Sequence, residues 1–506
     1  MRYVFYTSCA FFKLGAAVLS DEAERIYQEG NEVYFLFCDK IINVCSGNMR
    51  SNEGLCKSCT LWTKQNLSKL SKGIKLVSLR SYYRINEIKE WNYYDVEGLK
   101  CITYKETHIG LAVLSTYISK TRNQNPLIDC ESKPFFDNML NQAAGLVDAI
   151  ERVNGDLHPD CFCLYNGRLV EARGILDYMI SNHVETRVME VVHDVESGQI
   201  YKVNYNNCLP HDIKANQQIQ KEVWEQSTLP LEKKKEIARS FYVNRRYKKK
   251  AGDKIYTASQ NQGQLPTDFD KTKRNFVIFN SSEDEFAAVG GDYETLSLFK
   301  SQLDGIRYIL DTYQHNDRMH FYLRIHPNLK DVKYKYHTDL YNLSKEYSNI
   351  TVIGASETID TYCLMDNADT VLVFNSTIGI ESVYWGKPVI LLRASFYYYS
   401  DICYVPKTLE ELNVLIGQKL EPKFNNYVYK YGFNVMVAKQ TAVKFKTYNY
   451  FDWTPYKINF MGKTATGVNY QTLLGSKKLL LYLFSIMRTV FEKLYHDKFV
   501  IPIKEV

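Results

Sequence analysis

The fold of the C-terminal half of this chain is decided by residues 368–392, ADTVLVFNSTIGIESVYWGKPVILL. The apolar run Val371–Phe374 is typical of a buried strand, and the Ser-Thr-x-Gly segment after it begins a short helix. Gly-Lys-Pro then leads into a second apolar run, Val389–Leu392. Strand, helix and strand in this order predict a parallel α/β sheet.

A phosphate-binding turn is predicted where the first of these strands ends. Asn375, Ser376 and Thr377 bring hydroxyls next to the free N–H groups of a helix start, the positive end that attracts anions. Glu381 lies one turn further, at a spacing that does not fit a capping box, so its carboxylate suits ribose hydroxyls. The alternative is an ordinary helix cap with a solvated glutamate.

A second polar motif, RIHPN, ends the apolar run Met319–Ile325. Arg324 can hold a phosphate with two parallel hydrogen bonds, and His326 can donate to a phosphate or leaving-group oxygen. A single histidine is usually structural. Pro327 fixes the backbone just after His326, and a phosphate-type turn follows on a neighbouring strand, so we favour a functional histidine.

A third motif, NSSEDEF, follows the predicted strand Phe276–Phe279. Its spacing fits a capping box with Ser282 as the cap and Glu285 as its partner. A capped helix start is also a phosphate site, so Ser281 and Ser282 are candidates for donor binding as well as for capping.

Alternating strands and helices extend over both halves of the chain, which predicts two α/β domains. In the N-terminal half, the expected strands are 2–6, 32–38, 161–165 and 186–192, and the expected helices are 16–30 and 169–181. The C-terminal half continues through strands 276–279, 319–325, 350–353, 370–374 and 389–392. Residues 1–212 and 271–440 are therefore predicted to be the two domains, with 213–270 as a Lys-rich connection of helix and loop and 441–506 as a tail with a helix.

The motifs together resemble bacterial glycosyltransferases of the two-Rossmann-domain (GT-B) type that build capsule and lipopolysaccharide glycans. The resemblance rests on LYNGR, Glu190, QNQGQLP, NSSEDEF, RIHPN and STIGIESVYWGKP, and it spans most of the chain. The pairing of His-Pro with Ser-Thr is also similar to sialyl- and Kdo-transferases that use CMP-sugars. Glu381 with Gly386, Lys387 and Pro388 is similar to enzymes of UDP-sugars, so the nucleotide stays open.

The resemblance implies a nucleotide-sugar donor in the C-terminal domain and a saccharide or lipid-linked glycan acceptor in the N-terminal domain. The donor-binding candidates are Ser281, Ser282, Arg324, His326, Asn375, Ser376, Thr377, Gly379, Glu381 and Lys387. The acceptor-binding candidates are Asn166, Arg168 and Arg173, although an Asn-Gly turn alone also explains the first two.

Sugar transfer requires a stabilised leaving phosphate and, if the configuration inverts, a base for the acceptor hydroxyl. We expect Glu190 to be this base, because it ends an apolar strand where a cleft should lie; Glu171, His193 and Asp194 are the other candidates. The catalytic set is then Glu190, His326 and Arg168. An edge carboxylate paired with an arginine is the alternative for Glu190.

No Asp-x-Asp motif stands at a strand end, so the sequence predicts metal-independent transfer with no resident cofactor. Cys38, Cys45, Cys56 and Cys59 include a C-x-x-C pair, which leaves a structural zinc site open. Buried free thiols are the alternative, because such cysteines behave as small hydrophobic residues.

The net charge of +6 is too small to require nucleic acid. Thr7, Ser8 and Lys13 break the apolar N-terminus, so we expect a cytoplasmic protein. The tail 476–498 is expected to be a helix that packs across the domain junction or lies on the inner face of the membrane. A sugar-nucleotide epimerase and a non-catalytic glycan-binding protein are the competing functions.

Overall fold

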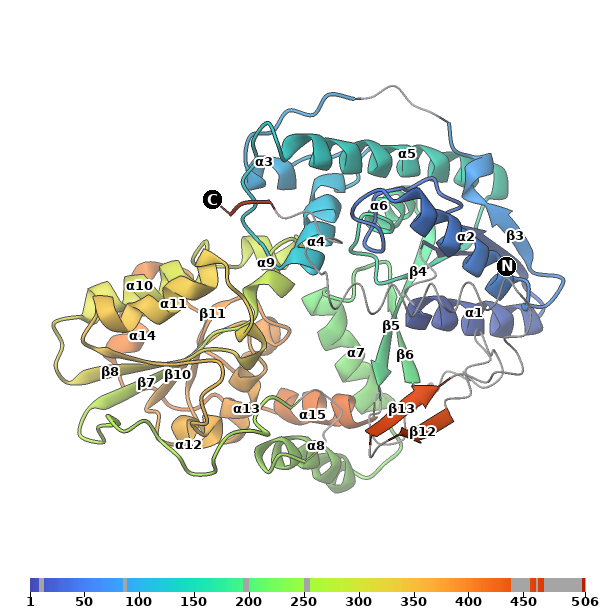
Figure 1. The fold of residues 1–506 in the computed structure, drawn as a ribbon. Helices are drawn as coiled ribbons and strands as arrows, with labels where there is room; N and C mark the ends of the chain where they lie inside the picture. Colours follow the sequence, from blue (N-terminus) through green and yellow to red (C-terminus); the bar gives the residue numbers. More distant parts are fainter. Residues whose placement is uncertain are drawn as a thin grey trace.

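The computed structural model describes residues 1–8, 13–84, 89–193, 200–249, 255–437, 456–460, 463–467 and 503–505. Two α/β domains lie next to each other in Figure 1, each built around its own sheet. The fold predicted from the sequence, two Rossmann-like domains with largely parallel sheets, is confirmed.

The N-terminal domain contains a six-stranded sheet in the order β3-β2-β1-β4-β5-β6, parallel except for β6. Its strands are β1 (Arg2–Thr7), β2 (Glu32–Phe37), β3 (Lys75–Ser78), β4 (Cys161–Tyr165), β5 (Glu185–His193) and β6 (Ile200–Asn206). Its helices are α1 (Lys13–Gln28), α2 (Glu53–Leu67), α3 (Val96–Lys100), α4 (Ile109–Thr121), α5 (Lys133–Leu157) and α6 (Arg173–Ser181).

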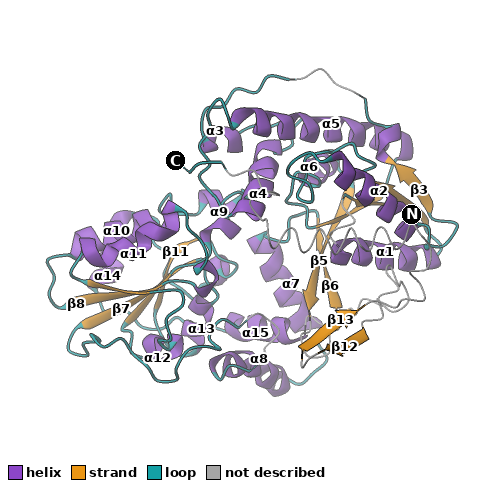
Figure 2. Ribbon diagram, viewed as in Figure 1, coloured by secondary structure: helices purple, strands orange, loops and turns teal. Residues whose placement is uncertain are grey.

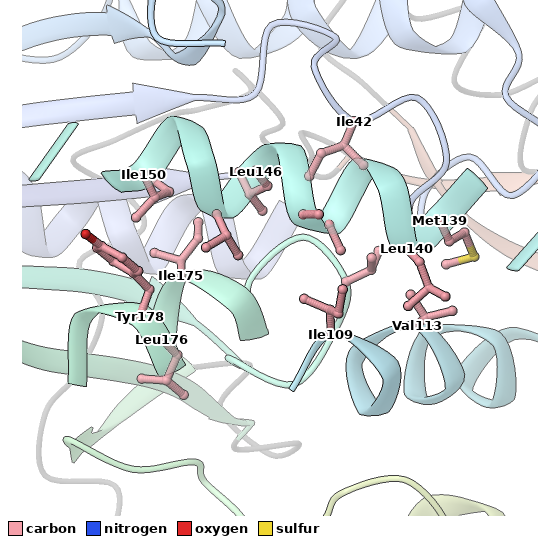
Figure 3. Close-up of a cluster of buried hydrophobic side chains, with 14 of the residues drawn as sticks. Ile42, Ile109, Val113, Met139, Leu140, Leu146, Ile150, Ile175, Leu176 and Tyr178 are labelled. Carbon is pink, nitrogen blue, oxygen red and sulfur yellow. The ribbon is translucent and has the colours of Figure 1, made fainter. Parts of the chain in front are cut away.

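The core of this domain is formed largely by α4, α5 and α6. Figure 3 shows residues such as Leu146 and Ile150 of α5, Val113 of α4 and Ile175 of α6 pointing toward one another. All four side chains are fully buried. Burial of this apolar surface is the main force that holds these helices on the sheet.

Two helices connect the domains, α7 (Ile213–Gln226) and α8 (Leu231–Arg246). Both pack against α15 (Tyr427–Val437), as Figure 2 shows at the base of the molecule. The region predicted as a helical and loop connection thus contains two helices, and both pack on the C-terminal part of the chain.

The C-terminal domain contains a five-stranded, fully parallel sheet in the order β11-β10-β7-β8-β9. Its strands are β7 (Arg274–Phe279), β8 (Met319–Arg324), β9 (Ile350–Ile353), β10 (Thr370–Phe374) and β11 (Val389–Arg393). Its helices are α9 (Asp292–Thr295), α10 (Gln302–Tyr313), α11 (Lys335–Glu346), α12 (Thr361–Asp366), α13 (Ile378–Tyr384) and α14 (Leu409–Gly417). A separate antiparallel pair follows, β12 (Tyr456–Phe460) and β13 (Lys463–Gly467).

Helices cover both faces of the C-terminal sheet, so its strands are largely apolar. Along β7, Val277 and Phe279 enter one core cluster while Phe276 and Ile278 enter another, the alternation of a strand with two buried faces. Every residue of β10 is buried. Burial on both faces explains why these strands could be predicted from continuous apolar runs in the sequence.

Candidate active site

A pocket of about 250 Å³ opens where the carboxyl ends of β7 and β10 meet. The chain runs from β7 outward to β8 and β9, and it then returns to β10 on the other side of β7. Open parallel sheets bind ligands at such a reversal, outside the carboxyl ends of the strands. The pocket is lined by loops after β7, β8 and β10, by α12 and α13, and by α8 with the segment that follows it.

The loop after β10 is shaped by its backbone and held from behind. Asn375 adopts a left-handed conformation with φ 49°, which asparagine tolerates better than most residues. The carbonyl of Ser376 accepts a hydrogen bond of 2.7 Å from the Tyr397 hydroxyl. Within the described part of the chain, the hydroxyls of Ser376 and Thr377 have no hydrogen-bond partner, and both residues line the pocket. These hydroxyls are therefore available to a ligand.

His326 lines the same pocket, and its imidazole is oriented by its own turn. Nδ1 accepts a hydrogen bond of 3.2 Å from the backbone N–H of Asn328, and the backbone N–H of His326 donates to Asn280 Oδ1 at 2.7 Å. The ring packs edge-on against Tyr256, with centroids 4.9 Å apart. Because Nδ1 is an acceptor, the neutral ring carries its proton on Nε2, a suitable donor to an anionic oxygen.

Arg324 lines the pocket but is held by carbonyls of its own domain. Its Nη1 donates to Gly354 O at 2.6 Å and its Nη2 to Glu357 O at 3.0 Å. Burial lowers the pKa of the guanidinium to about 10, so it stays charged at neutral pH. Its Nε is buried and has no partner within the described residues. The sequence predicts two parallel hydrogen bonds from Arg324 to a phosphate, but Nη1 and Nη2 already donate to these carbonyls. Nε–H is therefore the donor that can reach a ligand.

Glu381 is engaged by protein partners that sequence reasoning missed. Its carboxylate accepts a hydrogen bond of 3.0 Å from Arg245 Nε and another from the Tyr362 hydroxyl, and its side chain is only 1% exposed. Arg245 comes from α8 in the connection between the domains and also lines the pocket. The sequence had no signal for this pair, because 136 residues separate the partners.

The loop after β7 differs from its prediction. The capping box of Ser282 and Glu285 is wrong: residues Glu283–Glu285 form a 3-10 turn with no side-chain cap. The Ser282 hydroxyl instead donates to Asp284 Oδ1 at 2.9 Å and accepts from Arg122 Nη2 at 2.7 Å. Ser281 Oγ accepts from Gln302 Nε2 at 2.8 Å. Both serines still line the pocket.

The remaining donor-binding candidates, Gly379 and Lys387, do not line the described pocket. A Cβ at Gly379 would lie 2.1 Å from the Tyr397 hydroxyl, so this glycine allows the tyrosine to approach the loop. Lys387 Nζ donates to the carbonyls of Asp366 and Ala368, at 2.5 and 3.0 Å. Both residues support the site from behind.

Glu190, expected at the end of a strand, lies within β5 and faces the Asn-Gly turn after β4. Asn166 Nδ2 donates to its Oε1 at 2.6 Å. Burial raises the pKa of the carboxyl, and the hydrogen bonds from Asn166 and Tyr165 oppose that shift. A raised pKa suits a group that exchanges protons near neutral pH. Glu190 does not line the donor pocket.

Arg168 and Arg173 reach across to the C-terminal domain. Arg168 Nη1 donates to Glu285 O at 2.8 Å, and Glu285 lines the donor pocket. Arg173 Nη1 donates to Val289 O at 3.1 Å, while its Nε pairs with Asp177 at 2.8 Å. These two arginines therefore connect the LYNGR region of the N-terminal domain to the loop after β7.

His211 lies close to both arginines and was missed by sequence reasoning, because a single loop histidine carries no signal. Burial lowers its pKa to about 3, and the charges of Arg168 and Arg173 add to that shift. Its Nδ1 is buried without a partner among the described residues. The imidazole is therefore neutral at physiological pH.

A second pocket, of about 230 Å³, opens at the carboxyl ends of β1 and β4. The N-terminal sheet reverses its order between these two strands, as the C-terminal sheet does between β7 and β10. Asn166 and Glu171 line this pocket, and Ser46 donates to the Glu171 carboxylate. Of the other proposed bases, His193 ends β5 and Asp194 falls outside the described residues.

The four clustered cysteines, Cys38, Cys45, Cys56 and Cys59, line one small cavity of about 20 Å³. Burial raises the pKa of the Cys38 thiol to about 12, so it stays protonated. Among the described residues, no three His, Cys, Asp or Glu side chains are placed so that they could hold a metal ion. The sequence left a zinc site at these cysteines open without predicting one.

The predicted tail helix 476–498 falls outside the described residues. Within the described ranges, no helix combines the length and the apolar character that crossing a membrane requires.

Solved structures resemble the chain only distantly. The Kdo 2,4-transferase of Thermosulfurimonas dismutans KpsC is 14% identical, with a TM-score of 0.34 over 58% of this chain and 87% of that one. The UDP-GlcNAc 2-epimerase of Methanocaldococcus jannaschii is 10% identical, with a TM-score of 0.24 over 85% and 98% of the two chains. No curated protein sequence matches.

A family match is more informative, because it includes the whole donor pocket. Residues 171–406 match the family of capsule polysaccharide biosynthesis proteins. All residues that line the pocket, from Arg245 to Glu381, lie inside this range. The part of the chain that forms the pocket is thus similar to capsule polysaccharide biosynthesis proteins, in agreement with the resemblance noted in the sequence.

Proposed function

We propose that this protein is a glycosyltransferase that moves a sugar from a nucleotide-sugar donor to a growing capsule glycan. The observation that carries the proposal is the pocket between β7 and β10, where His326 and the free hydroxyls of Ser376 and Thr377 line one space. A nucleotide phosphate needs such neutral donors beside a fixed positive charge, and Arg324 supplies that charge. The family match supports a role in capsule synthesis.

In this proposal the reaction exchanges one bond for another at the anomeric carbon. The acceptor hydroxyl oxygen attacks that carbon while the bond from the carbon to the phosphate oxygen breaks. The developing charge on the leaving phosphate is stabilised by the Nε2–H of His326 and by the hydroxyls of the β10 loop. The acceptor proton passes to a carboxylate of the N-terminal domain.

Glu190 is the proposed base. Asn166 orients its carboxylate, and its raised pKa makes it a stronger proton acceptor than an exposed glutamate. Arg168 and Arg173 act as positioning residues, because they connect this region to the loop after β7. The acceptor, a saccharide or lipid-linked glycan at the inner face of the membrane, would occupy the pocket at β1 and β4.

The proposed transfer needs no divalent metal. The two carboxylates that line the donor pocket, Glu285 and Glu381, already accept hydrogen bonds from protein side chains. We therefore assign charge compensation at the phosphate to Arg324, with His326 as a neutral hydrogen-bond donor beside it. Transfer that persists in excess EDTA is the expected result.

The experiment that tests the function is a thermal-shift panel with CMP, UDP, GDP and CDP. One nucleotide should raise the Tm of the intact chain, since a ligand that binds only the folded state stabilises it. His326→Ala should abolish most of this shift. His315→Ala is the matched control, because His315 is exposed on the same domain and lies outside the pocket.

An unchanged shift in His326→Ala would contradict the proposed donor site. Product analysis separates transfer from epimerisation: a transferase forms a glycosidic bond only when acceptor is present, whereas an epimerase converts the donor without acceptor. A glycan-binding protein would show neither reaction and no nucleotide shift.

A further inference from the structure

A broad surface groove of about 540 Å³ lies outside the donor pocket, between α7, the 3-10 turn η4 (Tyr398–Ser400) and the start of α15. Figure 1 shows α7 and α15 next to each other below the domain junction. The groove is lined by lysines, tyrosines, amides and one serine: Lys214, Lys221, Lys430, Tyr399, Tyr427, Gln217, Gln218, Asn425, Asn426 and Ser400.

The charge of this lining is entirely positive. Lys214, Lys221 and Lys430 form no ion pair with a carboxylate in the described part of the chain. By contrast, Lys423, close by in sequence, pairs with Asp401 at 2.9 Å. Three ammonium groups without an ion-pair partner among the described residues lie around one hollow and attract an anionic ligand. One carboxylate stands beside this lining: Asp292 accepts a hydrogen bond of 3.0 Å from the Tyr399 hydroxyl.

The aromatic and amide groups indicate what kind of anion fits. Tyr399 is 42% exposed, and Lys214 Nζ lies 5.1 Å from its ring centre, so a flat apolar face stands next to a cation. Aromatic rings present large faces for stacking. Gln217, Gln218 and Asn425 already donate to Phe396 O, Glu222 and Ser400 O, so Asn426 is the amide that can donate to and accept from sugar hydroxyls. Rings with hydroxyls and negative charge are the features of an acidic oligosaccharide.

The groove is built rigidly and connects to the donor loop. Tyr427 OH and Gln217 Nε2 both donate to Phe396 O, at 3.2 and 3.0 Å. The next residue, Tyr397, holds the carbonyl of Ser376 in the donor pocket. One short segment, residues 396–400, therefore contributes to both the donor loop and the groove.

We propose that this groove binds an acidic segment of the glycan chain at a distance from the site of transfer. The inference rests on the proposed function, because a growing glycan chain is the saccharide that such an enzyme would meet, and the positive charge of the groove selects an acidic one. A groove of this kind would keep a long acceptor bound between successive additions.

The test measures binding of the intact chain to acidic oligosaccharides: oligogalacturonate, oligosialate and hyaluronan oligomers, with dextran oligomers of equal length as the neutral probe. At least one acidic probe should bind and dextran should not, with affinity falling as salt rises. The triple change Lys214→Gln, Lys221→Gln and Lys430→Gln should weaken binding about tenfold, since each exposed charge contributes modestly.

Two controls separate the groove from general electrostatics. The triple change Lys300→Gln, Lys345→Gln and Lys419→Gln removes the same charge from exposed lysines of the C-terminal domain outside the groove, and binding should persist. Tyr399→Ala should weaken binding more than Tyr399→Phe, which keeps the ring and loses only the hydroxyl that donates to Asp292 at 3.0 Å.

Absence of binding to every acidic probe, or equal loss in both lysine triples, would overturn the proposal. So would lysine-dependent binding to vesicles of phosphatidylglycerol and phosphatidylcholine without any binding to the oligosaccharides. The nucleotide-induced Tm shift is measured on the same variants. If the variant with all three groove lysines replaced keeps this Tm shift, its loss of glycan binding is separate from the donor site. If the wild-type chain shows no Tm shift with any nucleotide, that result counts against the proposed function alone.

Discussion

At the scale of single residues, the donor pocket depends on side chains that never touch its interior. Gly379 stands in α13 behind the Ser376 and Thr377 loop, and its missing side chain leaves room for the Tyr397 hydroxyl. That hydroxyl holds the Ser376 carbonyl at 2.7 Å. The geometry of the loop is thus set by one small residue and one large one.

Gly379→Ala should therefore disturb the donor loop. The added Cβ would lie 2.1 Å from the Tyr397 hydroxyl, which must move and release Ser376. We expect a loss of about 1–3 kcal/mol in the free energy of unfolding, typical of overpacking, together with a smaller nucleotide-induced Tm shift. Urea denaturation and the thermal-shift assay measure the two effects.

Gly417→Ala is the matched control, because it lies at the end of α14 with no atom within 4 Å of the added Cβ. It should leave both measurements nearly unchanged. A Gly379→Ala protein with unaltered nucleotide binding would show that the Tyr397 contact does not shape the pocket.

At the scale of elements, the antiparallel edge strand β6 is fastened to α1 by a buried ion pair. Lys202 of β6 contacts Glu22 of α1, with side chains 6% and 1% exposed. Arg25, in the same helix, also pairs with Glu22 at 2.7 Å. An edge strand has only one neighbour in its sheet, so this contact adds to a weakly held element.

Lys202→Met should cost about 3 kcal/mol of stability, because it leaves the buried Glu22 with only one cation. The double change Lys202→Met and Glu22→Gln should recover part of this loss. Lys75→Met serves as the comparison at the opposite edge of the sheet: its pair with Glu32 is exposed, so less than about 1 kcal/mol is expected. Equal losses at Lys202 and Lys75, measured by urea denaturation, would contradict the argument.

The strands of the two sheets differ in how well the sequence pattern predicted them. Strands of the C-terminal sheet were predicted to within two residues at each end, because strands covered on both faces are continuous apolar runs. The edge strands β3 and β6 were missed. β3 is only four residues long and none of them is buried, and β6 lacks the continuous apolar run by which the other strands were recognised.

At the scale of the whole molecule, the two domains are joined by contacts that converge on the loops of the donor pocket. Arg122 at the end of α4 donates to Asp284 at 2.8 Å, to Ser282 at 2.7 Å and to the carbonyl of Asn328 at 2.8 Å. Residues 503–505 of the C-terminus also contact both domains: Lys504 O accepts from Leu127 N at 2.7 Å, and Glu505 accepts from Tyr336 N at 3.3 Å.

Arg122→Gln should loosen this arrangement. Asp284 is 7% exposed and would lose its cation, which should cost about 1–3 kcal/mol and free the loops after β7 and β8. Faster amide hydrogen exchange at residues 282–285 and 326–329 is the expected measurement, with weaker nucleotide binding as its consequence. Arg318→Gln is the control: it removes an exposed charge from the C-terminal domain and should change neither the amide exchange nor the nucleotide binding. Unchanged amide exchange in Arg122→Gln would contradict the proposal that Arg122 holds these loops.

The sequence by itself determined the two α/β domains and the strand ends that carry His326, Ser376 and Thr377. Apolar periodicity and turn residues are local properties, and parallel strands bring their carboxyl ends to one edge. Only the tertiary structure decided the partners: Arg245 with Glu381, Arg122 with Asp284, and the tyrosines and lysines of the groove. Each pairing joins residues far apart in the chain. A local sequence pattern does not indicate which distant side chain the fold will bring within hydrogen-bonding distance.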